Sequence, residues 1–566
     1  MKQSETYNPS IVAKKGPSPL LVFCGLWVLL FLLYLPAARA GFVTDFLYWL
    51  NSIKFDSFSS WVNRTEADIH TLYQFRELVT YGFYIVLRTH AWLWHLLFIT
   101  MQATNAFLLY IIVLRLLVDM AVEKSVVISL GGVLLFCISP YISEVTVWKS
   151  CSHYLMGLMM LLLVLMLAQR YIQTLKKKYI VWAMIVYFLS TYSFEIFYIT
   201  PWLVLMLGLF YRYHAGFDKK IFNKLLLWFF IPELVLFAAN LVVFRVVYGT
   251  WAAHLTDKNS FALKIEDFGK PIRYFFHLIF MGRFFPEPVK DQVYHFCDSI
   301  GCICVFWGLI LLASINIAVR FGRMSGKGRV ASLLFVWMLM NTVLMIRVGF
   351  NGAMQVTCDR YVFCTGAFFY MLVGVLLSFI ASNVIRIGVF TLYAIPNLWF
   401  GILVNRYWGQ SHHVLYGLVH NLPTDGDKKI ILLNVPETMH GVPMIYAGEN
   451  SEYKLMHDML MPDDLIRQTV FDGMGYNMLT PNDGAHVTVL SDNKVRVTLN
   501  QFGTWWWYNG QGAVKYENED YWAYIMDVGH EYDLTLKKPV SDYLLLYNVG
   551  DKWKVVDMSK RDVAQY

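Results

Sequence analysis

The sequence predicts a polytopic α-helical membrane protein of about 11 transmembrane helices, followed by a C-terminal mixed α/β domain outside the cytoplasm. Of the 566 residues, 57% are hydrophobic and 15% are charged, whereas an ordinary soluble protein carries roughly 25% charged residues. Long apolar runs recur through the first 405 residues, and each can cross a bilayer as one helix. This composition excludes a disordered chain, a collagen-like chain and a single soluble domain.

The charge divides the chain into two parts. Residues 1–410 carry 34 Lys and Arg against 19 Asp and Glu, a net charge of +15, and residues 411–566 carry 13 against 21, a net charge of −8. The basic residues cluster in short loops between apolar runs, where the positive-inside rule places them, so no nucleic-acid partner is expected. All eight cysteines precede residue 411. The predicted domains are therefore 1–405, within the membrane, and 406–566, with a core that needs no disulfides.

The first apolar run extends from about Pro19 to Ala38. It ends in Ala38-Arg39-Ala40, which mimics a signal-peptidase site, but its length and the many runs that follow favour a retained helix. A polar stretch at about 41–88 then forms the first outer loop. The remaining apolar runs centre near residues 105, 133, 163, 186, 204, 236, 309, 338, 372 and 396.

The loops predict which side of the membrane each end of a helix faces. With the N-terminus inside, the inward loops are Arg115–Lys124, Arg170–Lys178, Arg212–Lys224, Arg320–Arg329 and the loop at Arg386. Four of these five loops are strongly basic, as the positive-inside rule requires. An odd number of spans then places the C-terminal domain outside: periplasmic in a bacterium, lumenal in a eukaryote. We expect a multi-pass protein of a bacterial inner membrane.

The tail has the pattern of a mixed domain. Ile430-Ile431-Leu432-Leu433 is typical of a buried strand, and His486–Leu499 alternates on both sides of Ser-Asp-Asn, which predicts a hairpin. Leu544–Val556 has the same form around Gly550-Asp551, and Ser451–Arg467 has a helical pattern. Strands and a helix together predict an α/β domain.

Acidic residues fall at the outer ends of several predicted helices. Asp45 follows the first helix, Glu144 follows Pro140, Glu195 lies at a turn, and Asp359-Arg360 precedes a late helix. Charges at these depths cost less than charges at a helix centre, and they can face a cavity. Each also has a structural alternative: a solvated loop residue, a helix cap, an internal ion pair or an interface marker.

Three short motifs occur in order from the first outer loop onward. Asp45 stands in Val43-Thr44-Asp45-Phe46, directly after the first helix. Arg76 stands in Phe75-Arg76-Glu77, ahead of a helix that carries His90, His95 and Asn105. Ser139-Pro140-Tyr141-Ile142-Ser143-Glu144 then precedes Trp148.

Two more motifs follow: Ser193-Phe194-Glu195 before Pro201, and the triplet Asp359-Arg360-Tyr361. Over about residues 20–405 this ordered set resembles the C-type (GT-C fold) integral membrane glycosyltransferases. It is most similar to the branch of protein O-mannosyltransferases and their bacterial relatives. The chain departs from that pattern at two points: the acidic pair of the first loop is a single Asp45, and the usual Arg-Pro dipeptide is Arg76-Glu77.

The resemblance implies transfer of a sugar from a polyprenyl-phosphate donor to an unidentified hydroxyl acceptor at the outer leaflet. A carboxylate takes the proton of the acceptor hydroxyl, and cationic side chains stabilise the leaving phosphate. The implied catalytic residues are Asp45, as the base, and Glu144. Arg76 and Arg360 are implied to bind the donor phosphate, with Lys149 a weaker candidate. The remaining implied substrate-binding residues are Glu66, Asp68, His90, Glu195 and Asp359.

No cofactor and no metal are expected, although Asp45 with Glu66 and Asp68 could form a divalent-metal site. A transporter or flippase of lipid-linked saccharides is the main alternative function. It would favour ionisable residues near the bilayer midplane and two repeated halves, and the sequence shows no repeat. A non-catalytic scaffold is the third possibility, and it predicts that Asp45 is dispensable.

Overall fold

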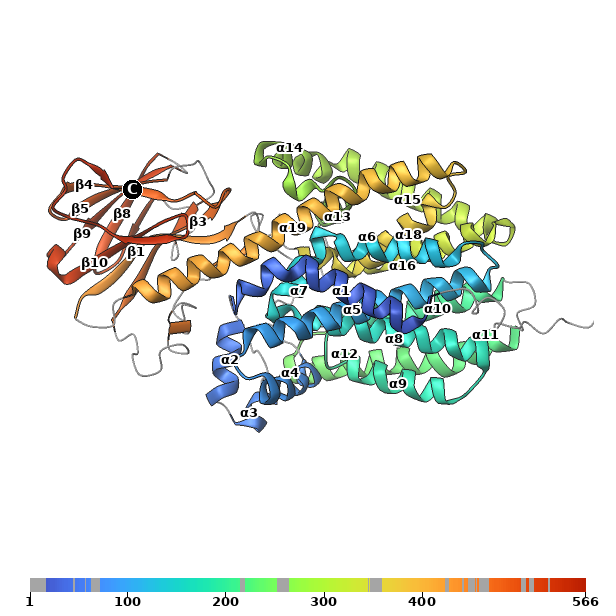
Figure 1. The fold of residues 1–566 in the computed structure, drawn as a ribbon. Helices are drawn as coiled ribbons and strands as arrows, with labels where there is room; N and C mark the ends of the chain where they lie inside the picture. Colours follow the sequence, from blue (N-terminus) through green and yellow to red (C-terminus); the bar gives the residue numbers. More distant parts are fainter. Residues whose placement is uncertain are drawn as a thin grey trace, which may run out of the picture.

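The computed structural model describes residues 17–565 apart from several short segments. The segments outside the described residues are 44–45, 56, 63–71, 214–218, 252–263, 345, 347–358, 423–426, 440–441, 446–453, 455, 458–467, 500–504, 508–513 and 528–529. A bundle of long helices occupies the first three quarters of the chain, and a separate β-rich domain follows it (Figure 1).

Each of the eleven predicted apolar runs lies in a helix of the bundle. Eight described helices are long and apolar enough to span a membrane, or nine if the bent pair Ser125–Ile138 and Pro140–Val147 is one span. The shorter α9 and the 19-residue α16, which opens with basic residues, contain the other two runs. The bundle helices are α1 (Pro19–Tyr34), α5 (Ala91–Asp119), α6 (Ser125–Ile138), α8 (Ser152–Thr174), α9 (Lys178–Ser190), α10 (Thr200–Arg212), α11 (Lys219–Leu225), α12 (Ile231–Tyr248), α15 (Ile300–Arg320), α16 (Gly326–Leu344), α18 (Phe363–Leu377) and α19 (Asn383–Asn421).

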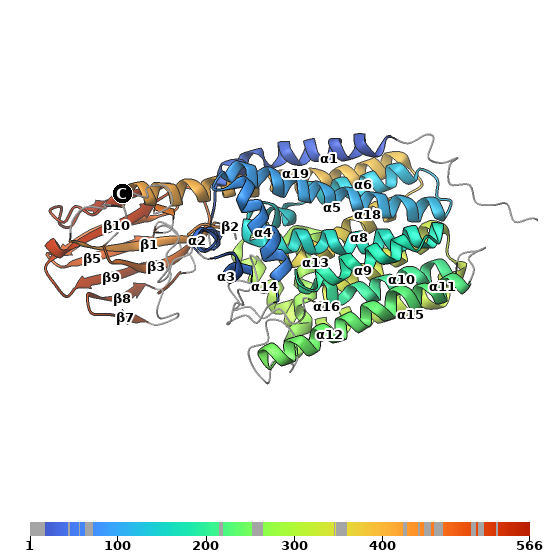
Figure 2. The ribbon, with the colours of Figure 1, turned by 90° about the horizontal axis from the view of Figure 1, so that it is seen from below.

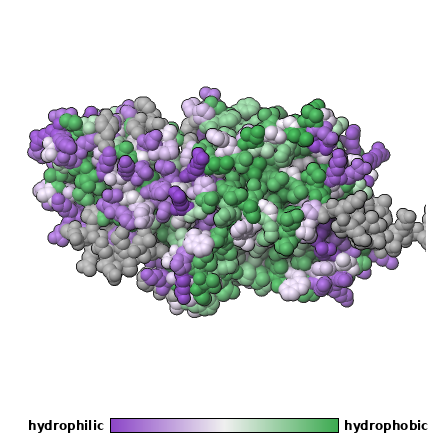
Figure 3. All heavy atoms as spheres, in the orientation of Figure 1, coloured by the Kyte–Doolittle hydropathy of each residue, from purple (hydrophilic) through white to green (hydrophobic). Residues whose placement is uncertain are grey.

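The helices divide into an inner group and a lipid-facing group. The spans that contain α8 and α18 are each 72% buried within the protein, whereas the span that contains α15 is 6% buried. Close packing inside the bundle depends on small residues where α6 crosses α18. A Cβ on Gly374 would lie 2.7 Å from the Cα of Gly132, so only glycine fits at this crossing. Figure 3 shows the apolar side chains as a belt between two polar ends, as expected for a protein in a bilayer.

The predicted inward loops meet at one end of the bundle, which we call the far end. Arg329 donates hydrogen bonds to the carbonyl oxygens of Tyr213 and Gly322, and the Lys327 ammonium donates to the Ser378 carbonyl. Arg329 therefore joins the loop Arg212–Lys224 to the loop Arg320–Arg329, and Lys327 joins the second of these to the end of α18. The other end, at which α19 leads into the C-terminal domain, is called the domain end.

The two longest predicted outer loops contain helices that the hydrophobic pattern did not indicate. The first loop forms α2 (Phe46–Phe55), α3 (Phe58–Val62) and α4 (Gln74–Leu87), and the later one forms α13 (Lys270–Phe280) and α14 (Glu287–Asp298). In Figure 2 these helices lie at the domain end of the bundle. Most of them are too short or too polar to cross a membrane, but they bury apolar side chains such as Phe46 and Leu278.

The described residues of the C-terminal domain form two six-stranded sheets. The first has the strand order β11-β10-β1-β3-β6, with β2 paired to β1, and the second has the order β12-β4-β5-β9-β8-β7. The strands are β1 (Lys429–Met439), β2 (Val442–Pro443), β3 (Val470–Met478), β4 (Ala485–Ser491), β5 (Lys494–Leu499), β6 (Trp505–Trp507), β7 (Lys515–Glu517), β8 (Tyr521–Asp527), β9 (Glu531–Leu536), β10 (Tyr543–Val549), β11 (Lys552–Val555) and β12 (Ala564–Gln565).

The strand predictions for this domain are confirmed. Residues 430–433 lie in β1 and are fully buried, while β4–β5 and β10–β11 form the two antiparallel hairpins. The parallel pairing of β1 with both β3 and β10 places β1 inside its sheet, which explains its continuous apolar run. Most of the predicted helix Ser451–Arg467 lies outside the described residues.

The helix α19 joins the two parts of the chain. It runs unbroken through the predicted domain boundary at residues 405–406, and the first strand of the C-terminal domain begins at Lys429. The Trp553 indole donates a hydrogen bond to the Val414 carbonyl at 3.0 Å, and the Ser411 hydroxyl donates to the Pro443 carbonyl at 2.7 Å. The end of α19 is therefore part of the packing of the C-terminal domain.

Asp520 links the two sheets, and its substitution should destabilise the domain. Its carboxylate accepts hydrogen bonds from Lys429 at 2.8 Å and from Tyr543 at 2.9 Å. Burial alone would raise the pKa of Asp520, but the hydrogen bonds from Lys429, Tyr543 and Lys538 lower it below the ordinary value. The ionised carboxylate therefore stabilises the fold above about pH 4, and this contribution is lost as the pH falls through the lowered pKa.

We expect Asp520→Asn to lower the free energy of unfolding by about 1–3 kcal/mol at neutral pH. The difference from the native protein should shrink as the pH falls below about 4 and disappear below the lowered pKa, where the native carboxyl is protonated as well. Thermal unfolding of the detergent-solubilised chain measures both effects. The exposed Asp542 provides the control, and a loss of stability for Asp542→Asn as large as that for Asp520→Asn would contradict this account.

Candidate functional site

A set of polar side chains gathers at the domain end of the bundle, where the helix after Ser125 is broken. The break follows α6, and the two parts of the bent pair meet at 63°. Pro140 begins the 3₁₀ turn η3 (Pro140–Ile142), and the Ser139 hydroxyl accepts the Tyr141 N–H at 3.2 Å. A proline ends a helix because it lacks an N–H and clashes with the preceding turn. The break directs α7 (Ser143–Val147), and with it Glu144, back toward the protein interior.

Glu144 and Arg360 form a bidentate contact between two distant parts of the chain. The Arg360 backbone N–H donates to one carboxylate oxygen at 2.9 Å, and its guanidinium donates to the other at 2.5 Å. The Glu144 side chain is 4% exposed and that of Arg360 is 18% exposed. The guanidinium also lies 4.9 Å from the ring centroids of both Trp148 and Tyr361. Arg360 is therefore held in one orientation by a carboxylate and two aromatic faces.

The neighbouring Asp359 forms a second ion pair, with Arg283. Both side chains are almost fully buried. Arg283 belongs to the 3₁₀ turn η8 (Gly282–Phe284), and Asp359 belongs to η11 (Asp359–Val362), directly before α18. Removing one member of a buried pair leaves the other charge uncompensated. Asp359 therefore binds η8, which lies between α13 and α14, and the adjacent Arg360 binds α7.

Glu195 accepts the hydrogen bond of a tyrosine hydroxyl from the first outer loop, shared between its two carboxylate oxygens. The Tyr73 hydroxyl lies 2.7 Å from each carboxylate oxygen of Glu195. Burial, and then the nearby Glu195 carboxylate, raise the pKa of Tyr73 well above its ordinary value. Tyr73 thus remains a neutral hydrogen-bond donor at physiological pH.

Arg76 lies next to Tyr73 at the start of α4. Its guanidinium lies 4.2 Å from the ring centroids of both Trp49 and Tyr73, and it pairs with the adjacent Glu77. The α4 backbone is anchored as well, because the N–H groups of Phe75 and Arg76 donate to the Tyr192 carbonyl. The first outer loop is therefore attached to the bundle at the turn that carries Glu195.

Aromatic rings connect these contacts into one set. The His153 ring lies 5.8 Å from Tyr73 and 4.6 Å from Tyr154, and Tyr154 lies 6.1 Å from Tyr361. We call this set the polar cluster. Its charged and hydroxyl members are Tyr73, Arg76, Glu144, Glu195, Arg283, Asp359 and Arg360.

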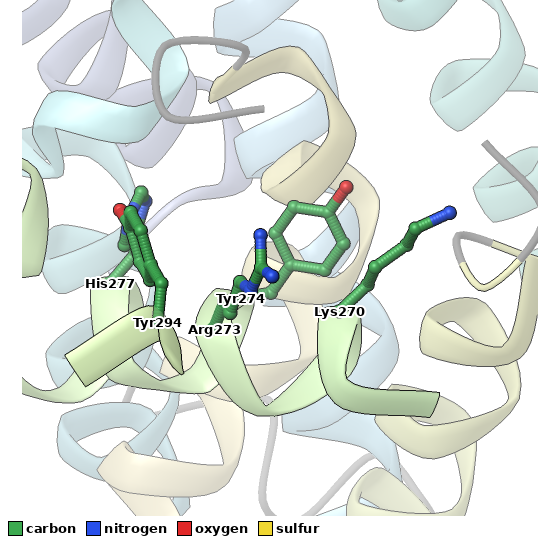
Figure 4. Close-up of a pocket in the computed structure, with 5 residues that line it drawn as sticks. All are labelled: Lys270, Arg273, Tyr274, His277 and Tyr294. Atoms are coloured by element: carbon green, nitrogen blue, oxygen red, sulfur yellow. The ribbon is translucent and has the colours of Figure 1, made fainter. Parts of the chain in front are cut away.

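A small pocket lies beside the polar cluster, between α13 and α14. Figure 4 shows His277 and Tyr294 side by side at one end of the pocket, Arg273 and Tyr274 in the middle and Lys270 at the other end. Arg273 donates to Asp298 at 3.0 Å, and Lys270 lies 2.8 Å from Asp267.

His277 connects this pocket to the bundle. Its Nε2 lies 2.5 Å from the Tyr294 hydroxyl, and its backbone carbonyl accepts a hydrogen bond from Tyr141 at 2.7 Å. Burial, followed by the charges of Arg283, Lys290 and Arg273, lowers the pKa of His277 to about 3. His277 is therefore neutral at physiological pH, and the positive potential around it comes from arginine and lysine.

Comparison with known proteins identifies no family for this chain. No family model matches it, and no curated protein matches it. Among solved structures, it is similar to the crystal structure of ArnT from Cupriavidus metallidurans in the apo state. The two are 12% identical with a TM-score of 0.31, and the match covers 79% of this chain and 89% of that chain. At this level of similarity the match supports no inference about activity.

The structure brings together five of the nine residues that the sequence singled out. Arg76, Glu144, Glu195, Asp359 and Arg360 all belong to the polar cluster. His90 directly precedes α5, and its side chain is exposed. The other three, Asp45, Glu66 and Asp68, lie outside the described residues. The same is therefore true of the possible metal site that they would form. Within the described part of the chain, no group of three or more His, Cys, Asp and Glu side chains is arranged to hold a metal.

Sequence reasoning missed Arg283, which lies in a segment where no helical pattern of hydrophobic residues is evident. The sequence of α13, Lys-Pro-Ile-Arg-Tyr-Phe-Phe-His-Leu-Ile-Phe, contained a usable signal, because its basic and aromatic residues recur at helical spacing. Lys149 is buried, and its ammonium donates to the Val147 carbonyl at 2.6 Å.

Proposed function

We propose that this protein is a membrane glycosyltransferase that moves a sugar from a polyprenyl-phosphate donor to a hydroxyl acceptor outside the cytoplasm. The main support is the polar cluster, in which five segments separated by up to about 290 residues contribute carboxylates and guanidinium groups to one end of the bundle. Buried charges inside a membrane protein are costly and mark functional sites more often than structural ones.

The cations of the cluster suit a phosphate leaving group. When the sugar leaves its donor, negative charge accumulates on the phosphate oxygens, and fixed guanidinium groups stabilise that charge without rearranging. Arg360 is oriented by Glu144, Trp148 and Tyr361. We assign Arg360 and Arg76 to the donor phosphate, and we assign Arg283 to the same electrostatic environment.

Three carboxylates of the polar cluster are proposed to position other side chains rather than to take a proton. Glu144, Glu195 and Asp359 are already occupied by Arg360, Tyr73 and Arg283. Each of these carboxylates is engaged with a fixed partner. We therefore propose that Glu144 acts mainly by positioning Arg360, that Asp359 orients Arg283, and that Glu195 orients the Tyr73 hydroxyl.

Asp45 is the proposed general base. It follows η2 (Leu35–Ala40) and directly precedes α2, and the flanking Val43 and Phe46 are buried against the bundle. In the proposed reaction Asp45 takes the proton of the acceptor hydroxyl, and the acceptor oxygen forms a bond to the anomeric carbon. The bond from that carbon to the phosphate oxygen breaks, and polyprenyl phosphate leaves with the electron pair. We assign Glu66, Asp68 and His90 to substrate contacts.

We also propose that the domain end faces away from the cytoplasm. Two of the basic inward loops contact each other at the far end, where the positive-inside rule places the cytoplasm. The C-terminal domain then lies in the periplasm of a bacterium, beside the leaflet in which a translocated lipid-linked sugar is available.

The decisive experiment separates transfer from transport. The purified chain is reconstituted in vesicles with a radiolabelled polyprenyl-phosphate hexose and a membrane extract as acceptor. We expect acceptor-dependent release of polyprenyl phosphate, with the label appearing in the extract. A flippase would move the intact donor between leaflets without breaking the bond between the sugar and the phosphate. Translocation without release would therefore overturn the proposed function, as would release that does not depend on the protein.

A further inference from the structure

A groove of about 330 Å³ lies on the C-terminal domain, remote in the chain from the polar cluster. It is lined by residues of β7, β8 and the segment after β9: Lys515, Tyr516, Glu517, Trp522, Tyr524 and Lys537. The strand β7 forms one edge of its sheet, and β8 is its neighbour. The groove therefore lies at the open edge of the domain.

Two large aromatic side chains are exposed on β8. Trp522 is 42% exposed and Tyr524 is 43% exposed, whereas the intervening Ala523 and the preceding Tyr521 are buried. Alternate residues of a strand point to the same face, so Trp522 and Tyr524 share the outer face of the sheet. A soluble domain normally buries such rings, and tryptophan and tyrosine that remain exposed are typical of binding surfaces.

The strand register surrounds each ring with polar groups. Trp522 pairs with Glu517 on β7 and with Thr535 on β9, so a carboxylate and a hydroxyl lie on either side of it. Tyr524 pairs with Lys515, which is exposed, and with Asp533, which is buried. Two rows thus cross the sheet, and each has an aromatic ring between hydrogen-bonding side chains.

The two rows are also held in place at the edge. Lys537 lies 2.6 Å from Glu517, which joins the end of β9 to β7. On the other side, Asp533 accepts a hydrogen bond from Arg496 at 2.7 Å and lies 2.7 Å from Lys494. These ion pairs restrict the polar groups beside the rings, so the surface needs little ordering when a ligand binds.

We propose that this groove binds an oligosaccharide. A pyranose ring has an apolar face of C–H groups and a rim of hydroxyl groups. The apolar face matches the rings of Trp522 and Tyr524, and the hydroxyl rim matches the carboxylate, ammonium and hydroxyl groups beside them. A lipid surface fits poorly, because charged residues flank both rings. A peptide that added a strand to β7 would bind along the edge, while the two rings lie on the face of the sheet. The proposal does not depend on the chemistry of the polar cluster.

The test uses the full-length protein in detergent and three neutral probes: maltoheptaose, mannohexaose and chitohexaose. Isothermal titration with each probe up to about 10 mM should show saturable binding of at least one of them. Trp522→Ala should weaken that binding roughly tenfold or more, since stacking on a ring contributes on the order of one tenfold step in affinity. Trp522→Phe should retain most of the binding, and Trp522→Ala with Tyr524→Ala should abolish it.

Met526→Ala is the matched control, because Met526 is exposed on the same strand and lacks a ring. It should leave the affinity unchanged. Thermal unfolding of every variant shows whether the domain is intact, which is expected because the three substituted side chains are all exposed. The proposal is overturned if none of the three saccharides binds, or if Trp522→Ala with Tyr524→Ala binds as tightly as the native chain.

Discussion

Purified Asp45→Asn should transfer sugar about 10²–10⁴ times more slowly than the native protein, which is the usual cost of losing a general base. Asparagine keeps the size of the side chain and most of its hydrogen bonding, but it cannot accept the proton of the acceptor hydroxyl. The amount of folded protein and its melting temperature should remain close to those of the native chain. The rate is measured per folded molecule with a polyprenyl-phosphate hexose as donor.

Asp56→Asn provides the comparison, because Asp56 is an acidic residue of the same outer segment. We expect nearly normal transfer from Asp56→Asn. Equal, near-normal rates for the two variants would remove Asp45 as the base, and Glu66 would become the next candidate. A poorly folded Asp45→Asn with normal activity per folded molecule would instead assign Asp45 a structural role.

The membrane helices and the principal strands could be predicted from the sequence because each follows a local rule. The run near residue 372 lies in α18, and the run near residue 163 lies in α8, since any apolar segment of that length must become a helix in lipid. The hairpin β4–β5 follows from alternation around Ser491, Asp492 and Asn493. In this hairpin the hydrophobic alternation of the sequence has the same two-residue period as the strands, so the strands can be predicted without tertiary information.

The short helices at the domain end follow no such rule. The α13 sequence contains Lys270, Arg273 and His277 and is too polar for a span, so hydropathy alone assigned it to a loop. Its helix is stabilised by packing against the bundle, with Leu278 fully buried. Similarly, no local signal could show that the predicted domain boundary falls inside α19, since the same helix is lipid-exposed at its start and packed against the β-domain at its end.

Part of the polar cluster was predicted in its residues, but none of it in its pairings. Glu144, Glu195, Asp359 and Arg360 were identified because they lie at the outer ends of helices. Their partners depend on how the helices are arranged, and 216 residues separate Glu144 from Arg360. Arg283 could not be assigned to Asp359 without the fold. Pairings of this kind are long-range contacts, and a single sequence contains no direct measure of them.

The pair Glu144–Arg360 allows a test that separates folding from activity. Arg360→Met removes the guanidinium and leaves the Glu144 carboxylate buried without its partner. We expect the free energy of unfolding to fall by about 3–5 kcal/mol, as when one member of a buried ion pair is removed. Transfer per folded molecule should also fall by roughly 10²–10³, the cost of removing one preorganised charge donor from a reaction site.

The double variant Glu144→Gln with Arg360→Met removes both charges together. An uncharged pair of similar volume is often as stable as the ion pair it replaces, so we expect its melting temperature to return to near the native value. The transfer rate should stay low, because no guanidinium is present to stabilise the leaving phosphate. Since Arg360 acts on the donor and Glu144 only holds Arg360, Glu144→Gln alone should retain more activity than either variant without Arg360. If the double variant recovered both stability and transfer, the pair would be a structural link between α7 and η11, and the phosphate would have to be bound by Arg76 or by the cations of α13 and α14.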